Sequence, residues 1–172
     1  GTDGEDADKK GKEYYLDYIV NRNSIRQWSM KKLADYGFDA PNNIWYECPG
    51  YSMGVVTTFC DFADRMDEQA GKDLFKEIPQ LVKSNTAALQ YLMPNRMICG
   101  YGDTHPWYMS TKGIDAVLRY AERHGNAALK QEFETLKKAV ASDAPTSLVE
   151  QYVSKTFYAP KSSWLIQRTG MD

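Results

Sequence analysis

The sequence predicts a mainly α-helical fold that ends in a short β-hairpin. Apolar residues recur at helical spacing over most of residues 13–153. Gly37 and Gly71 follow two of these segments, and glycine commonly ends a helix. After residue 153 the pattern changes to two short runs rich in aromatic and aliphatic side chains, which is typical of strands. We therefore expect antiparallel helix pairs over residues 13–153, because consecutive helices pack in this way, and a hairpin within residues 154–172.

The composition favours one globular domain and argues against two classes of partner. Of the 172 residues, 42% are hydrophobic and 13% aromatic, which is enough for a core. The formal net charge is -2, whereas nucleic-acid-binding domains usually carry a basic excess. No apolar run is long enough to span a bilayer or to form the core of a signal peptide. We expect no nucleic acid and no membrane among the partners.

The elements follow in order from a polar start. Residues 1–12 are interpreted as a flexible leader, and its Gly1 start, in place of Met, is typical of a cut end. Two helices are expected over about residues 15–20 and 25–36, with Asn23 or Ser24 as the N-cap of the second. Pro79 should interrupt one of the later helices. Those later helices are expected at about residues 52–69, 72–92, 112–124, 126–141 and 146–153.

Two long loops, residues 38–50 and 94–111, interrupt the helical pattern. Long loops inside compact domains are often functional. Because helices that run up and down put alternate loops at one end, we expect these two loops to lie together.

The hairpin consists of residues 156–158 and 164–168 around a turn at residues 159–163. Two strands do not form a stable sheet alone. They must therefore pack on the helices or belong to a further domain.

The cysteines and histidines do not indicate a metal centre. Cys48, Cys60 and Cys99 form no CxxC pair, and the chain has only two histidines. We expect buried free thiols, no metal and no cofactor. The sequence also lacks a nucleophile elbow, a phosphate loop, an HExxH motif and a dinucleotide fingerprint.

The loop before residue 52 holds the first group of candidate functional side chains. An indole and a phenol, which can stack on sugar rings, stand beside amide and carboxylate groups that can bind hydroxyls. Tyr51 follows the rigid pair Pro49-Gly50 at a helix entrance, a good place to hold one side chain fixed. The alternative is that Trp45, Tyr46 and Tyr51 only cover the core.

The loop Gly100–Tyr108 holds the second group. Its glycines permit unusual backbone angles, and Asp103 and His105 could form a pair. The alternative is an Asp-Thr turn that caps the next segment and leaves His105 exposed.

Three segments carry a resemblance to a known family. Trp45–Tyr51 has the form W-Y-E-x-x-G-Y, Met93–Asp103 begins with M-P and ends with G-x-G-D, and Lys155–Gly170 resembles the entry into a β-sandwich. Together they are similar to the heparinase II/III-like polysaccharide lyases over most of residues 12–172. The resemblance implies that residues 13–153 form part of an incomplete α/α toroid. It also implies that residues 154–172 begin a β-sandwich or form a linker hairpin.

The resemblance implies β-elimination at a uronic acid, in which a base removes the C5 proton and the C4–O bond breaks. It gives Tyr51 the role of catalytic base or acid. A phenol has a pKa of about 10, so this role needs nearby cations or donors that stabilise the phenolate. The candidates for substrate binding are Asn43, Trp45, Tyr46, Glu47, Asp103, His105 and Trp107.

The same resemblance implies partners beyond this chain. The substrate would be a uronate polysaccharide or oligosaccharide, such as a glycosaminoglycan or alginate, met in the periplasm or after secretion. The family also uses an Asn or His pair from upstream helices and a His from the downstream β-sandwich, so we expect the chain to be inactive alone. Two alternatives stay open, a carbohydrate-binding helical module without chemistry and a purely structural helical protein.

Overall fold

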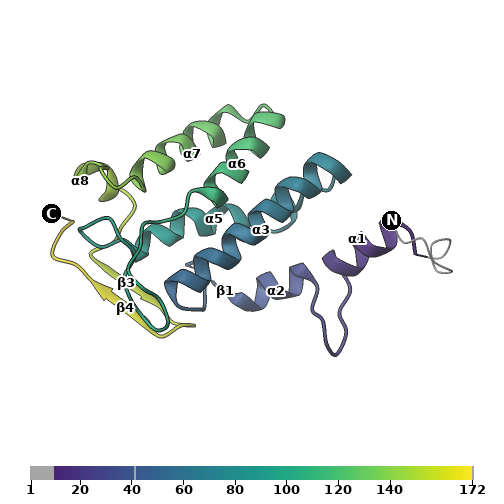
Figure 1. The fold of residues 1–172 in the computed structure, drawn as a ribbon, viewed down its shortest axis with the longest axis horizontal. Coiled ribbons are helices and arrows are strands. Elements are labelled where there is room, and N and C mark those ends of the chain that lie inside the picture. Colours follow the sequence, from purple (N-terminus) through teal and green to yellow (C-terminus); the bar gives the residue numbers. More distant parts are fainter. Residues whose placement is uncertain (1–9, 41, 172) are drawn as a thin grey trace. The chain divides into compact units, whose positions relative to one another are not determined.

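The computed structural model describes residues 10–40 and 42–171, and these form a mainly α-helical fold with two small hairpins (Figure 1). The prediction of a helical fold that ends in a β-hairpin is therefore confirmed. The chain divides into one compact unit that ends at Gly37 and another that begins at Phe38. The helices of the second unit are α3 (Pro49–Ala70), α4 (Leu74–Glu77), α5 (Gln80–Ala87), the 3₁₀ helix η1 (Ala88–Tyr91), α6 (Lys112–Arg123), α7 (Ala127–Ala139) and α8 (Thr146–Val149).

The first unit contains α1 (Lys12–Val20) and α2 (Met30–Gly37). The second helix begins later than predicted, because the Ser29 hydroxyl accepts the backbone N–H of Lys32 at 3.2 Å and so acts as its cap. The Asn23 side chain accepts the N–H of Ser29 at 3.0 Å instead, so it shapes the preceding turn. Ile25, expected on the helix, lies before it and is exposed. Residues 1–9 of the predicted leader lie outside the described residues.

In the second unit, α3, α6 and α7 lie side by side (Figure 1). Asp64 and Asp67 of α3 contact Arg123, the last residue of α6, and His124, which directly follows it. Asp61 lies near Arg119, so both helices run in the same direction. Helix α7 returns antiparallel to α6. The pair Lys130–Glu122 near the α6–α7 turn and the pair Lys137–Asp115 farther from it show that direction.

The breaks between helices follow glycine and proline as expected. Gly71 ends α3 with a φ of 62° and gives its N–H to the carbonyl of Asp67. Pro79 separates α4 from α5. The chain then tightens into η1, whose Leu89 and Tyr91 are fully buried.

The C-terminal hairpin pairs β3 (Thr156–Ala159) with β4 (Trp164–Gln167), in the register Phe157 to Ile166. Trp164 is buried, with its ring 5.0 Å from that of Tyr91. The Arg168 guanidinium donates to the carbonyls of Gln90 and Leu92. Of the two possibilities left open for this hairpin, the structure shows packing on the helices.

The two long loops lie at the same end of the helices, as predicted. The first contains the short pair β1 (Phe38–Asp39) and β2 (Ile44–Trp45). This loop leads into α3 at Pro49. The N–H of Gly50, the next residue, donates to the hydroxyl of Thr104 in the second loop at 2.9 Å. Among the helices of the described residues, none is long and apolar enough to cross a membrane.

Candidate functional site

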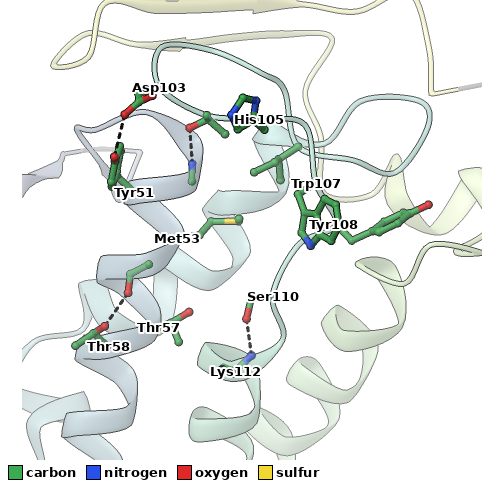
Figure 2. Close-up of a pocket in the computed structure, with 14 residues that line it drawn as sticks. Tyr51, Met53, Thr57, Thr58, Asp103, His105, Trp107, Tyr108, Ser110 and Lys112 are labelled. Atoms are coloured by element: carbon green, nitrogen blue, oxygen red, sulfur yellow. Dashed lines mark hydrogen bonds between the residues drawn. The ribbon is translucent and has the colours of Figure 1, made fainter.

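Tyr51 lies in the first turn of α3, at the end where the two loops meet. Pro49 occupies the start of this helix, where its fixed φ suits the first turn and its missing N–H costs nothing. The Tyr51 side chain is 53% exposed, and its hydroxyl donates to Oδ2 of Asp103 at 2.9 Å (Figure 2). A residue pair separated by 52 positions is thus joined at the surface.

Close approach of the two loops depends on Gly102. Its φ of +62° lies in the left-handed region, and a Cβ there would lie 3.0 Å from the Cβ of Cys48. Since Gly102 directly precedes Asp103, this geometry places the carboxylate over the start of α3.

Tyr51 and Asp103 stand at one side of an open pocket of about 610 Å³. His105 lines it, together with Trp107 and Tyr108, and the Trp107 indole is 71% exposed (Figure 2). Exposed rings around an open pocket can stack on sugar rings. The pocket is further lined by Gly50, Met53, Gly54, Thr57, Thr58, Ile98, Thr104, Ser110 and Lys112.

The helix turn that carries Tyr51 is supported from inside the fold. Ser52 is buried and accepts a hydrogen bond from the hydroxyl of Tyr91 at 3.0 Å. Burial raises the pKa of Tyr91 far above its usual range, so its phenol stays a neutral donor. This support was not predicted from the sequence, because nothing in the local pattern connects η1 with the start of α3.

The structure does not bring every predicted site residue to the pocket. Tyr51, Asp103, His105 and Trp107 line it, whereas the four candidates of the first loop do not. Trp45 is only 9% exposed and packs against Phe38 and Phe59, while its Nε1 donates to Glu47 Oε2 at 2.7 Å. Tyr46 is exposed and stacks against Trp45, and Asn43 is half-buried with a positive φ of 57°.

The charge next to Tyr51 has the opposite sign from the one a phenolate needs. Within the described residues, Asp103 bonds to Tyr51 and makes no hydrogen bond to His105. The hydrogen bond to Asp103, with the negative charge of that carboxylate, raises the pKa of Tyr51. The arrangement therefore holds a protonated phenol at the pocket edge, which suits a proton donor better than a base.

The described residues contain no cluster of His, Cys, Asp and Glu that could hold a metal ion. All three cysteines are free thiols. Burial raises the pKa of Cys60 to about 12, so this thiol is unreactive, while Cys48 and Cys99 are half-buried.

The pocket lies within a stretch of the chain that matches a family model. The model is described as the second domain of endo-acting ulvan lyase, and it matches residues 41–156, including every pocket residue. The chain belongs to this family. No curated protein and no solved structure matched the chain. The resemblance to polysaccharide lyases is therefore confirmed, while the match to the ulvan lyase domain does not specify the heparinase II/III type.

Proposed function

We propose that this ulvan lyase domain takes part in cleaving a uronic-acid-containing glycan by β-elimination, with Tyr51 as a catalytic residue. The observation that carries the proposal is the meeting of Tyr51 and Asp103 at the edge of an open pocket with exposed aromatic rings. Ulvan is the substrate suggested by the description of the family.

The geometry favours one of the two roles open to Tyr51. In β-elimination, a base takes the C5 proton, the C4–O bond breaks, and the leaving oxygen gains a proton. A general acid must keep its proton until that bond breaks. Because Asp103 raises the pKa of Tyr51, the phenol is suited to protonate the leaving oxygen. The base then comes from outside this chain. The resemblance implies two sources, the Asn or His pair of the upstream helices and the histidine of the downstream β-sandwich.

The remaining candidates act around this group. Trp107 and His105 line the pocket and bind the sugar directly. Trp45 and Glu47 hold the loop before Pro49 through their hydrogen bond, and so position Tyr51 from outside the pocket. Asn43 and Tyr46 belong to the same loop, which shapes the entrance of α3.

The proposal extends to architecture and location. The helical pairs are proposed to be part of an α/α toroid of which other helices supply the rest, with a β-sandwich downstream of the hairpin. Since polymeric glycans do not cross membranes, the enzyme is proposed to act in the periplasm or after secretion.

Tyr51→Phe in the full-length enzyme tests the catalytic assignment. This change removes only the hydroxyl, and turnover of ulvan should fall by about 10²–10⁴-fold, the usual contribution of a positioned acid or base. Formation of unsaturated uronate, followed by its ultraviolet absorbance, is the measurement. Tyr158→Phe is the matched control, because Tyr158 is exposed on β3, outside the pocket, and should leave turnover unchanged.

The alternative function is glycan binding without chemistry. It is favoured by the exposed rings of Trp107 and Tyr108 at the pocket, which can stack on a sugar without any proton transfer. Ulvan binding by the full-length protein without formation of unsaturated uronate would favour this alternative. Full turnover in Tyr51→Phe would discard the catalytic role of Tyr51.

A further inference from the structure

The pocket at Tyr51 continues into a second hollow along α3 and α6. Thr57, Thr58 and Lys112 line both, so the two hollows meet at these residues. The second hollow has a volume of about 450 Å³. In Figure 2, these three residues lie on the side of the pocket away from Tyr51 and Asp103. The other residues of the second hollow are all charged: Asp61, Arg65, Asp115 and Arg119.

The carboxylates of the second hollow already have cationic partners. Asp61 accepts from Nε of Arg65 at 3.0 Å, and Asp115 accepts from Nζ of Lys137 at 2.7 Å. With three basic and two acidic side chains, the lining has a surplus of one positive charge. An anionic ligand is therefore favoured over a cationic one.

Lys112 differs from the other cations of this lining. In the part of the chain that the structure describes, its ammonium has no ion pair and no hydrogen bond, whereas Arg65 and Arg119 are both paired. The Thr57 hydroxyl, which lines the same two hollows, likewise has no hydrogen bond there. The Thr58 hydroxyl donates to the carbonyl of Gly54 at 2.9 Å. Lys112 and Thr57 can thus take up a ligand without losing a contact within the protein.

We propose that Lys112 and Thr57 form an accessory subsite for an anionic group, a carboxylate or a sulfate ester, on a sugar residue next to the one that reaches Tyr51. This inference rests on the proposed function, because it requires a glycan in the Tyr51 pocket. A polymer held at an internal linkage extends beyond the reacting sugar on both sides. On one side of the reacting sugar, the glycan would lie along the charged second hollow between α3 and α6.

The test is binding of native ulvan to the full-length protein in a Tyr51→Phe background. Lys112→Gln should weaken binding by about tenfold at low salt, since one charge-assisted contact is lost. The difference should shrink as salt screens the charge. Lys138→Gln is the matched control, because Lys138 is an exposed lysine of α7 that lines neither hollow. It makes the same change in net charge and should leave binding within about twofold.

Two modified polymers identify the group that is bound. If Lys112→Gln has no effect on desulfated ulvan, the subsite binds sulfate, and if it has no effect on carboxyl-reduced ulvan, the subsite binds the carboxylate. Equal affinity with and without Lys112 on native ulvan, an equal loss in Lys138→Gln, or no measurable binding by the parent protein would overturn the inference. Retained turnover in Tyr51→Phe would instead discard the catalytic role while leaving the effect of Lys112 on affinity measurable.

Discussion

Trp45 and Trp107 stand in two aromatic loops that meet at one end of the helices, yet they have opposite environments. Trp45 is 9% exposed and packs edge-on against Phe38 and Phe59, whereas Trp107 is 71% exposed at the pocket. Both were candidates for substrate binding, and for Trp45 the reason was an indole that stands beside amide and carboxylate groups. An indole in such a loop is available to a ligand only where the fold brings no apolar partner to its face.

The two loops consequently have different roles at the site. In the first, Phe38 pairs with Trp45 across the β1–β2 ladder, and the buried indole fixes the chain that leads to Tyr51. In the second, the Gly102 turn projects Asp103 toward Tyr51, and Trp107 remains open to solvent. One loop is a rigid base, and the other supplies most of the surface that a glycan would touch.

The largest effect is expected from Trp45→Ala, which tests the first half of this comparison. Removing a buried indole should lower the free energy of unfolding by about 3 kcal/mol, since a cavity is left between Phe38 and Phe59. Chemical denaturation of the full-length protein, with the transition of this domain resolved, is the measurement. Unchanged stability together with weaker glycan binding would mean that Trp45 serves the ligand and not the core.

Trp107→Ala should weaken glycan binding and leave stability nearly unchanged, and its effect should be smaller than that of Trp45→Ala. Stability should change by less than about 0.5 kcal/mol, because an exposed side chain has few contacts to lose. Binding of ulvan should weaken by about 1 kcal/mol, the order of one aromatic stacking contact. Trp107→Phe keeps a ring and should retain most of the affinity. If alanine and phenylalanine bind equally well, stacking at this position is excluded.

The smallest effect is a change in the pH profile of Asp103→Asn. The carboxylate of Asp103 raises the pKa of Tyr51, so it keeps the phenol protonated to higher pH. Removing the charge should move that pKa down toward its ordinary value. The alkaline limb of kcat in the full-length enzyme should then shift to lower pH if Tyr51 is the general acid. An upward shift would contradict this sign, and an unchanged limb would mean that another group controls it.

Much of the fold was predictable because its signals are local. Pro79 and Gly71 end helices for reasons of backbone geometry that act within a few residues, and the structure follows them. The start of α2 was not predicted, since Asn23, Ser24 and Ser29 are all good caps by residue type. Only the completed turn, in which Asn23 accepts from Ser29, decides between them.

The site was predictable in part for the same reason. Helices that alternate in direction bring the two loops together, and this places Asp103 at Tyr51. The burial of Trp45 and the junction at Lys112 depend on contacts between segments far apart in sequence. The bond of Asp103 to Tyr51, and not to His105, depends likewise on a detail of the Gly102 turn.

The docking of the hairpin has a practical consequence for anyone who shortens this protein for expression. Residue 153 looks like a natural cutting point, because the helical pattern stops there. A chain trimmed at that position would lose Arg168, which donates to the carbonyls of Gln90 and Leu92, and Trp164, which covers Tyr91 and Tyr101. Since Tyr91 holds Ser52, next to Tyr51, the damage would extend to the entrance of α3. Expression boundaries should therefore keep the strands through Arg168, even where only the helices are wanted.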